Sequence, residues 1–334
     1  MCVTIIKFVN QKNGWFSVEK ILLPLRENGY SFKDLFSDFI RIKKYSNLSE
    51  YTLIYYQRCF DYFAKFFDVG SSCSCITIDT IYDYIAYQSE KLSINEITIN
   101  TNLRGLKAIL YYGMEMGYLS YFKIKLLKTE KEIKEVYTNE ELTLLLKRPD
   151  VKKCSFAELR SWAITNYLLA TGNRLSTLAN LKIGDIDFNN NEIILRKTKN
   201  RKQYIIPLSE ELAIVLKDYL SYRKGTSKED CLFCSVYGDK LSNRGIQDSI
   251  QKYNNKRGVF KTSIHIYRHT FAKHYLLNGG DIFRLKEILG HSSIEIVKEY
   301  VNMFLGDLKK DFNTFNPLDN IIRNNRKERI KMIN

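Results

Sequence analysis

The residues that could carry out chemistry in this chain stand towards its C-terminus in a fixed order. His265 and Arg268 are three residues apart, His291 follows a Leu-Gly pair, and Tyr300 comes nine residues later. Arginine offers a forked, permanently charged donor to the non-bridging oxygens of a phosphodiester. A tyrosine hydroxyl becomes a nucleophile when nearby cations or a base help it to lose its proton. Together these side chains can break a phosphodiester without a metal.

Helical patterns predict how these residues are positioned. Apolar side chains recur at helical spacing over 264–277, which places His265 and Arg268 on one face at the start of a helix. The next helix is expected to end at Gly290, so His291 lies just past a helix end. A capping box then predicts a third helix, with Tyr300 at the edge of its apolar face.

This order of residues resembles the C-terminal signature of the tyrosine recombinases, the phage integrase and Xer family. That signature is a His-x-x-Arg pair, then Leu-Gly-His, then a nucleophilic tyrosine nine residues on. The family's first arginine lies upstream in a Thr-Gly-x-Arg segment, which matches Arg174. Its lysine lies in a hairpin, and counting back from Pro207 places Lys199 on it, although a shifted turn would select Lys197 or Lys202. The six matching positions are Arg174, Lys199, His265, Arg268, His291 and Tyr300.

The resemblance implies a role for each position. The two arginines bind the non-bridging phosphate oxygens, and His291 donates to one of them. Lys199 acts as general acid on the leaving 5′-oxygen, and His265 is our candidate base, with a share in phosphate binding. Tyr300 forms a 3′-phosphotyrosine, which stores the bond energy for rejoining. No cofactor and no metal are expected.

Three features lie outside this pattern. His269 and His274 match no catalytic position, so we interpret them as structural. Many family members carry an acidic residue three positions after the first arginine, where this chain has Thr177. A hydroxyl can still hydrogen-bond a guanidinium, but it cannot balance its charge.

Composition predicts the partner. The chain has 334 residues, a net charge of +15 and a hydrophobic content of 45%, which is enough for two domains with real cores. The excess of Lys and Arg indicates a polyanionic partner, for which double-stranded DNA is the natural candidate and an acidic membrane surface the competing one. No apolar stretch is long enough to span a membrane, and the first residues lack the layout of a signal peptide. We therefore expect a cytoplasmic protein that is not bound to a membrane.

The seven cysteines are scattered, which indicates reduced thiols. Cys231 with Cys234, and Cys73 with Cys75, each supply two close thiols, so a zinc site is an alternative interpretation. Neither pair has the regular spacing of a four-ligand site. Leu232 and Phe233 instead predict a short buried strand.

The predicted fold is mainly α-helical with a small antiparallel sheet. Four amphipathic helices in the first part of the chain resemble the family's helical, SAM-like core-binding domain, which clamps DNA from the side opposite the mixed α/β catalytic domain. A three-stranded antiparallel element is expected around 184–208, with helices at about 139–147 and 156–170 before it and mostly helical chain after it. The expected parts are an extension (1–30), the core-binding domain (31–122), a charged linker (123–137), the catalytic domain (138–316) and a basic tail (317–334).

Basic side chains outside the signature are candidate DNA contacts. Arg104 and Lys107 stand three apart on the fourth helix, where a solvated face is the alternative. Arg201 and Lys202 lie in the basic hairpin. In relatives a C-terminal segment docks on a neighbouring subunit, and for the tail over 317–334 nonspecific contact with DNA is an equal alternative.

The sequence therefore predicts a site-specific recombinase that acts as a homotetramer on specific DNA sites, through a 3′-phosphotyrosine and a Holliday junction. Accessory DNA-bending proteins are compatible with this role. The added residues 1–30 and the departure at Thr177 favour integration or excision of a mobile element over chromosome-dimer resolution. A type IB topoisomerase-like enzyme and a catalytically silent DNA-binding protein are the alternatives.

Overall fold

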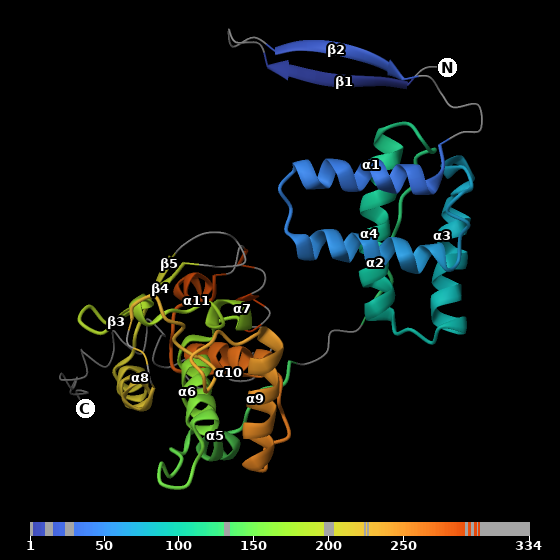
Figure 1. Ribbon diagram of the computed structural model, residues 1–334. Coiled ribbons are helices and arrows are strands. Elements are labelled where there is room, and N and C mark those ends of the chain that lie inside the picture. Colours follow the sequence, from blue (N-terminus) through green and yellow to red (C-terminus); the bar gives the residue numbers. More distant parts are fainter. Residues whose placement is uncertain are drawn as a thin grey trace, which may run out of the picture. The chain divides into compact units, whose positions relative to one another are not determined.

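The computed structural model divides into two compact units, Met1–Lys131 and Glu132–Asn334 (Figure 1). Each unit is described by itself. The residues that the structure describes are 3–10, 16–23, 30–129, 134–196, 204–223, 225, 227–290, 293–294, 297–298 and 300.

The first unit begins with a two-stranded antiparallel hairpin. Strand β1 (Val3–Asn10) pairs with β2 (Phe16–Leu23), and the register places Val3 opposite Leu23. This hairpin lies in the segment that the sequence predicts to be an N-terminal extension.

Four helices form the body of the first unit, as predicted. The side chains of Ser31, Ser49, Thr77 and Asn95 each accept a hydrogen bond from a backbone N–H in the first turn, so each helix begins at a good N-cap. The helices are α1 (Phe32–Tyr45), α2 (Glu50–Ala64), α3 (Ile78–Ala86), which continues into a π-helical turn (Tyr87–Lys91), and α4 (Glu96–Glu115).

The core of this unit is rich in aromatic side chains. Phe63 packs edge-on against Phe32, with ring centroids 5.0 Å apart, and against Tyr84, also at 5.0 Å. All three side chains are fully buried. Such pairs add to the free energy gained by burial, so the four helices are held by a mainly apolar core.

Seven helices are described in the second unit, and α6 is central among them. Helix α6 packs against α5, α8, α9 and α10, and Trp162 and Tyr167 are buried along it. The predicted starts at Thr138, Ser155 and Asp281 are confirmed as N-caps. The helices are α5 (Asn139–Leu146), α6 (Phe156–Thr171), α7 (Leu175–Leu178), α8 (Glu210–Tyr222), α9 (Asn243–Lys256), α10 (Ile264–Leu277) and α11 (Ile282–Leu289).

The predicted three-stranded antiparallel sheet is confirmed. Strands β3 (Ile186–Asp187), β4 (Glu192–Leu195) and β5 (Tyr204–Pro207) pair in that order. Ile193 faces Ile206 across the central pair, and both are buried. The sheet is therefore anchored in the core of the second unit through one face.

The prediction of a strand at Leu232 and Phe233 is wrong. Both residues are buried, but the segment forms only isolated bridges, from Cys231 to Lys182 and from Cys234 to Lys240. Two buried arginines explain the difference, because Arg223 donates to the carbonyl of Cys231 and Arg160 to that of Cys234. These two carbonyls therefore already accept side-chain donors in the place where a strand would accept backbone N–H groups.

Several predicted features lie outside the described residues. They include the turn between β4 and β5 with Lys199, Arg201 and Lys202, the capping box at Ser292 and Glu295, and the tail over 317–334. In the part of the chain that the structure describes, no helix has both the length and the apolar character that crossing a membrane requires.

Candidate active site

Helix α6 ends at a glycine that brings three elements together. Gly172 has φ of 60°, in the left-handed region that favours glycine. A Cβ at this position would lie 2.6 Å from Cδ1 of Phe271 and 2.7 Å from Cδ2 of Leu289, which no side chain could accommodate unless its neighbours moved. The glycine therefore allows α10 and α11 to approach the end of α6, directly before Arg174.

The two predicted arginines converge on the C-terminal carbonyls of α6 and α11. Arg268 donates from Nη1 to the carbonyl of Gly172 at 2.8 Å and from Nη2 to that of Leu289 at 2.9 Å. Arg174 donates from Nη1 to the carbonyls of Leu289 and Gly290, both at 3.3 Å. Helix C-termini carry partial negative charge, which favours cations there. Both guanidinium groups thus share the Leu289 carbonyl and lie side by side.

This arrangement is electrostatically strained for Arg268. Its residue is only 5% exposed, and burial together with the nearby charge of Arg174 lowers its pKa to about 10. Tyr300 and Tyr204 act in the opposite direction, in part through a hydrogen bond between Tyr300 and Arg268. Carbonyl groups carry only partial charge, so a phosphate anion would stabilise this pair of cations more strongly than the backbone does.

The predicted nucleophile lies beside Arg268. Tyr300 is 2% exposed and packs in an apolar cluster with Ala272, Leu285 and Leu289. Its hydroxyl oxygen is 2.8 Å from Nδ1 of His269. Residues of three segments far apart in sequence, around 174, 268 and 300, therefore meet at one place.

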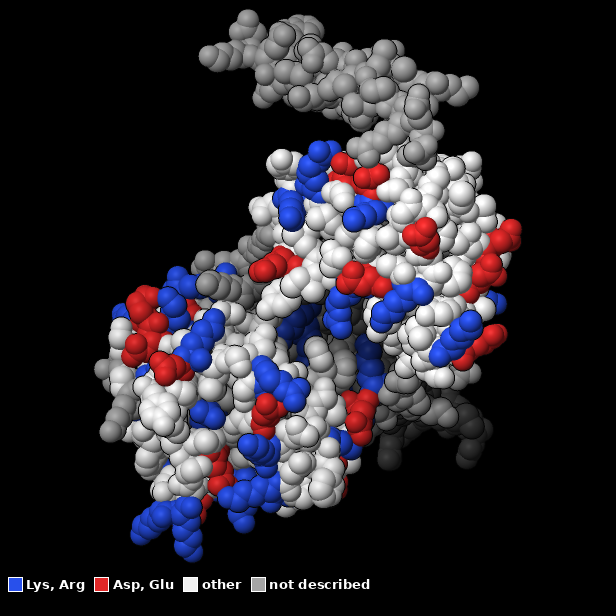
Figure 2. All heavy atoms as spheres, turned by 45° about the vertical axis from the view of Figure 1, so that its right-hand side comes forward, with Lys and Arg blue, Asp and Glu red and all other residues white. Residues whose placement is uncertain are grey.

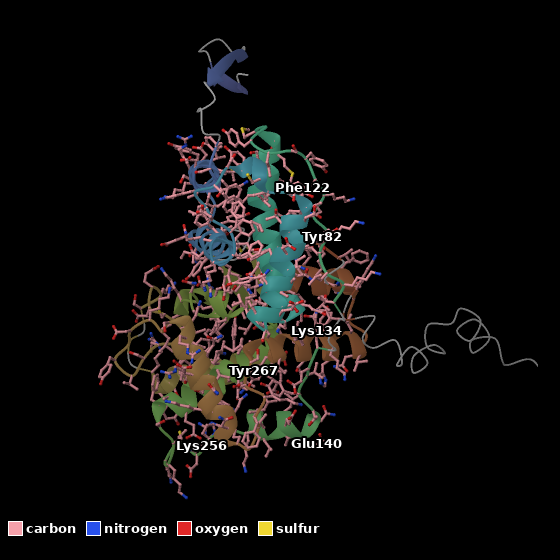
Figure 3. All side chains as sticks on the ribbon, turned by 90° about the vertical axis from the view of Figure 1, so that its right-hand side faces the viewer. Tyr82, Phe122, Lys134, Glu140, Lys256 and Tyr267 are labelled. Atoms are coloured by element: carbon pink, nitrogen blue, oxygen red, sulfur yellow. The ribbon has the colours of Figure 1, made fainter. Side chains whose placement is uncertain are left out.

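A further cation lies over the ring of Tyr300. Nζ of Lys134 is 4.8 Å from the ring centroid, at the distance of a cation–π contact. Lys134, labelled in Figure 3, stands at the start of the described chain of the second unit. A positive charge there would favour the ionised form of the tyrosine over the neutral form.

The structure brings His265 to the arginines and not to the tyrosine hydroxyl. Burial of its ring, followed by the charges of Arg268 and Arg174, lowers the pKa of His265. The residue as a whole is nevertheless exposed. A neutral imidazole near the two arginines can accept a proton or a hydrogen bond at neutral pH. The hydroxyl of Tyr300 contacts His269 instead, although the sequence analysis interprets that histidine as structural.

The base of the basic hairpin reaches the same place. Gly290 ends α11 with φ of 60°, and a Cβ there would lie 2.6 Å from the hydroxyl oxygen of Tyr204, the first residue of β5. Arg196, the last described residue before the turn, forms an ion pair with the buried Asp185. The start of β5 therefore lies beside Gly290, whose carbonyl accepts from Arg174, and the end of β4 is held by Asp185. Lys199 and His291 themselves lie outside the described residues.

Thr177, which replaces the acidic residue of many relatives, is buried one turn after Arg174. Its backbone N–H donates to the carbonyl of Arg174 within α7. Arg174 is thus positioned by the local helix start and by the end of α11. Among the described residues, no carboxylate pairs with it.

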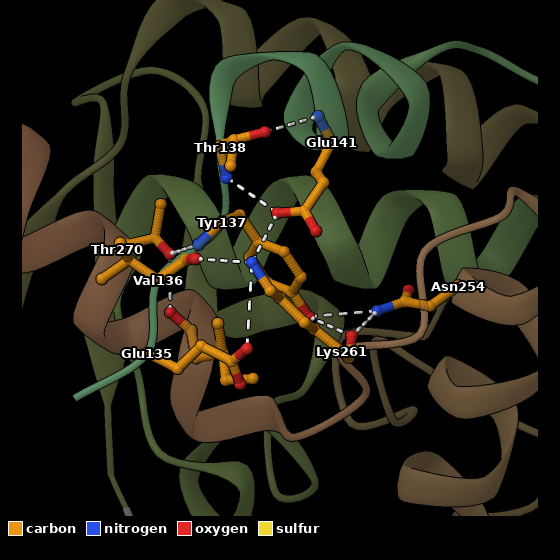
Figure 4. Close-up of polar contacts among 9 residues, drawn as sticks. Glu135, Val136, Tyr137, Thr138, Glu141, Asn254, Lys261 and Thr270 are labelled. Atoms are coloured by element: carbon orange, nitrogen blue, oxygen red, sulfur yellow. Dashed lines mark hydrogen bonds and ion pairs between the residues drawn. The ribbon is translucent and has the colours of Figure 1, made fainter. Parts of the chain in front are cut away.

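A polar network fixes the start of the second unit to α9 and α10 (Figure 4). The Tyr137 N–H donates to the Thr270 hydroxyl at 3.0 Å, and the Tyr137 hydroxyl donates to the Lys261 carbonyl at 2.8 Å. The Asn254 amide donates to the Tyr137 hydroxyl and to the Lys261 carbonyl, and it accepts from the hydroxyl of Tyr267. Tyr267 lies among the packed helices in Figure 3. The network holds α10 on either side of Arg268 and His269, and it holds the chain that carries Lys134.

The two candidate DNA contacts of the first unit differ in their exposure and in their contacts within the fold. Arg104 is exposed on α4, whereas Lys107 donates to the carbonyl of Ile124 at 3.1 Å and lies 5.0 Å from the centre of the Tyr111 ring. Lys and Arg side chains are distributed over the drawn face of each unit and are interspersed with Asp and Glu (Figure 2). Arg104 is therefore the better candidate of the two.

The cysteine pairs do not have the chemistry of a zinc site. Burial raises the pKa of the Cys73 thiol to about 12, which disfavours the thiolate that zinc requires, whereas Cys75 is exposed. Cys234 is buried and Cys231 is half-buried. In the described ranges, no group of three or more His, Cys, Asp or Glu side chains is placed to hold a metal ion.

Sequence reasoning missed two residues at this site. His269 could have been noticed because it follows Arg268 directly and lies one helical turn after His265. Lys134 had no comparable signal, because it stands in a charged run where solvated lysines are the rule.

Comparison with known proteins gives the context of this site. Residues 135–305, just over half of the chain, match the phage integrase family. The tyrosine recombinase XerC of Haemophilus ducreyi is 27% identical over 284 residues, which cover 84% of this chain and 92% of that protein.

Two solved structures share the fold. The Tn1549 transposon integrase in complex with a circular intermediate DNA has a TM-score of 0.66 at 23% identity, covering 81% of this chain and 95% of that one. A lambda integrase dimer bound to a COC′ core site has a TM-score of 0.64 at 15% identity, covering 80% and 97%. At these identities the likeness extends to the fold alone.

Proposed function

Because the chain belongs to the phage integrase family of tyrosine recombinases, we propose that it exchanges DNA strands through a phosphotyrosine at Tyr300. It is an enzyme that breaks and rejoins DNA by tyrosine-type site-specific recombination. The observation that carries the assignment of the site is the convergence of Arg174 and Arg268 on the carbonyl of Leu289, with Tyr300 beside Arg268.

The phosphate is bound first. The scissile phosphodiester replaces backbone carbonyls as the partner of Arg174 and Arg268, whose forked donors suit its two non-bridging oxygens. The charge on those oxygens grows as the fifth ligand adds to phosphorus, so the arginines stabilise the transition state more than the ground state. His265, exposed and beside both arginines, contributes to phosphate binding, and His291 donates to one of its oxygens.

Cleavage then exchanges one ester for another. The Tyr300 oxygen forms a bond to phosphorus, the bond to the 5′-oxygen breaks, and Lys199 gives that oxygen a proton. The bond energy is kept in the 3′-phosphotyrosine, so the 5′-hydroxyl of a second duplex can reverse the step. Two such exchanges in sequence pass through a Holliday junction.

The assembly that follows from strand exchange is a homotetramer on two double-stranded recombination sites. The related lambda integrase is described as a dimer on a core site, and the Tn1549 integrase as a complex with DNA. We propose that residues 31–122 form the DNA clamp, with Arg104 as a phosphate contact, and that 138–316 form the catalytic domain. Work on DNA is consistent with a cytoplasmic location.

The proposed biological role is integration or excision of a mobile element. The N-terminal hairpin β1–β2 and the buried Thr177 beside Arg174 support it. Chromosome-dimer resolution is the second candidate, because the curated relative named above is a XerC recombinase. The DNA sequence that the enzyme selects separates the two, since a site at the ends of a mobile element favours the first role and a chromosomal site the second.

The test uses a pool of nicked duplexes with a random central sequence. Cleavage beside the nick releases a short strand, so the covalent adduct is trapped and its DNA can be sequenced. We expect an adduct with the natural chain and none with Tyr300→Phe, and an adduct that survives this change contradicts the proposal.

The recovered sequence then serves in an exchange assay between two duplexes. Exchange supports a recombinase. Relaxation of a supercoiled plasmid without exchange indicates a topoisomerase-like enzyme, and binding with neither activity indicates a silent DNA-binding protein.

A further inference from the structure

Building on the function proposed above, we propose that His269 is a further catalytic residue, which takes the proton of Tyr300 as its hydroxyl attacks phosphorus. The sequence signature gives no role to this histidine, and the six matched positions do not include it. The proposal rests on the contact between the Nδ1 atom of His269 and the reacting oxygen.

The contact has the geometry of proton transfer. Nδ1 of His269 and the hydroxyl oxygen of Tyr300 are 2.8 Å apart, within the range for a general base and its donor. The ring centroids are 5.6 Å apart and the planes are tilted by 48°. A neutral imidazole with its proton on Nε2 presents a lone pair at Nδ1, which is the acceptor that the hydroxyl requires.

The backbone that carries His269 is fixed from within the fold. The next residue, Thr270, accepts a hydrogen bond from the Tyr137 N–H, and Tyr267 on the same helix donates to Asn254 at 2.9 Å. Both side chains are buried. The direction of the His269 side chain is therefore set by packing on the opposite face of α10, as a catalytic group requires.

His265 and His269, two of the three histidines of α10, have different surroundings. His265 lies close enough to Arg174 and Arg268 for their charges to lower its pKa, which places it with the phosphate ligands. Its ring centroid is 6.5 Å from that of His269. Only His269 of the two contacts the Tyr300 hydroxyl. The candidate base of the sequence analysis is thus replaced by its neighbour one turn along.

The surroundings of Tyr300 favour the anion that proton removal creates. Arg268 hydrogen-bonds with Tyr300, and the Lys134 ammonium lies 4.8 Å from its ring centroid. Cations at these positions stabilise a phenolate relative to a phenol. An imidazole base can then take a proton from a tyrosine hydroxyl, whose own pKa is about 10 in water.

The step balances as follows. The O–H bond of Tyr300 breaks and its proton moves to Nδ1 of His269, while the oxygen forms a bond to phosphorus. The bond between phosphorus and the 5′-oxygen breaks, and that oxygen receives a proton from Lys199. On rejoining, a 5′-hydroxyl attacks phosphorus, its proton returns to Lys199, and the departing Tyr300 oxygen recovers its proton from His269.

The experiment measures single-turnover cleavage of the duplex recovered by covalent capture. In His269→Asn the amide places a hydrogen-bonding atom close to the position of Nδ1 but cannot take a proton, and His269→Ala removes both functions. We expect both variants to lose about 10²–10⁴-fold in cleavage rate. His274→Asn, on the same helix, is the matched control and should keep the natural rate.

A second substrate separates the two proton transfers. A 5′-bridging phosphorothiolate has a thiolate leaving group that needs no proton, so it should restore cleavage by Lys199→Ala but not by His269→Asn. The acidic limb of the natural enzyme's pH–rate profile should also disappear in His269→Asn. Gel-shift binding and thermal melting of each variant control for folding.

Three results would overturn the proposal. The first is full activity of His269→Asn, which would mean that the contact only positions Tyr300. The second is full activity of His269→Ala. The third is rescue of His269→Asn by the phosphorothiolate. If the natural chain itself forms no adduct, the proposed function fails instead. The contact is then tested without DNA by nitrogen NMR of His269, where an Nδ1 resonance unmoved by Tyr300→Phe contradicts the proposal.

Discussion

The two units differ in what they bury. The first unit has an aromatic and aliphatic core, and over residues 30–129 its buried polar side chains are the neutral Gln88, Asn100 and Asn102. The second unit buries charged side chains as well, namely Arg160, Asp185, Arg223 and Arg268. Burying a charge is unfavourable unless it is hydrogen-bonded or paired.

The partners of these side chains explain how the second unit can bury charge. Arg160 and Arg223 bind loop carbonyls, and Asp185 holds Arg196, so these three have structural partners. Arg268 also donates to two carbonyls, but it lies beside a second cation, Arg174, and beside Tyr300. We therefore propose that the first unit is organised for stability, whereas the second holds cations for an anion that the substrate supplies.

The largest effect is expected from a change in the apolar core of the first unit. Phe63→Ala should lower the free energy of unfolding by about 3–5 kcal/mol, because it removes a buried ring that packs against Phe32 and Tyr84. Urea unfolding of the full chain measures it. Tyr45→Ala, at a residue 84% exposed, is the control and should change little. Equal effects of the two changes would contradict the described core.

The next largest effect is expected from a change of Arg268 that lowers the cleavage rate but not the stability of the fold. Arg268→Met removes two donors to the phosphate and should lower cleavage by about 10²–10³-fold, the cost of losing a transition-state donor. Because the buried cation disappears as well, the free energy of unfolding should fall by less than about 1 kcal/mol. Cleavage and urea unfolding are measured on the same preparation. A large loss of stability with unchanged cleavage would reverse our view of the second unit.

A smaller effect is expected in the polar network of Figure 4. Asn254→Ala leaves the Tyr267 hydroxyl without its acceptor and removes one of the two donors to the Lys261 carbonyl, so stability should fall by about 1–3 kcal/mol. Asn255→Ala, exposed on the same helix, is the matched control. If hydrogen exchange around Thr270 is unchanged in Asn254→Ala, the network does not hold α10 as described.

The smallest effect is a pH dependence confined to the second unit, which contains all four histidines. Burial lowers the pKa of His265 and of His274. The unfolded chain therefore binds more protons than the folded chain below about pH 6.5, and stability falls as the pH drops. Both residues are at least partly solvated, so the loss between pH 7.5 and 5.5 should be less than about 1 kcal/mol. An unchanged slope in His265→Asn/His274→Asn would contradict this assignment.

Local signals account for what the sequence could predict. The caps at Ser31, Ser49, Thr138 and Asp281 lie within one turn of the helices that they start, so each start could be predicted from neighbouring residues. The sheet could be predicted for the same reason, because short apolar segments over 184–208 are separated by turn residues.

Contacts between distant segments could not be predicted in this way. The approach of Tyr300 to His269 depends on how the chain after α11 returns to α10, and no periodicity encodes that. Leu232 and Phe233 have the composition of a strand, but two arginines from other elements take the carbonyls beside them. Lys107 was predicted to contact DNA, and its partner Ile124 became visible only in the fold.

The most direct test of the whole account asks which tyrosine becomes joined to DNA. Trypsin cleavage after Lys298 and Lys309 gives a peptide in which Tyr300 is the single tyrosine of the chain's 23. The covalent complex formed on the recovered duplex is digested with trypsin and nuclease and examined by mass spectrometry. We expect a nucleotide on the Tyr300 peptide, and a nucleotide on any other tyrosine would contradict Tyr300 as the nucleophile.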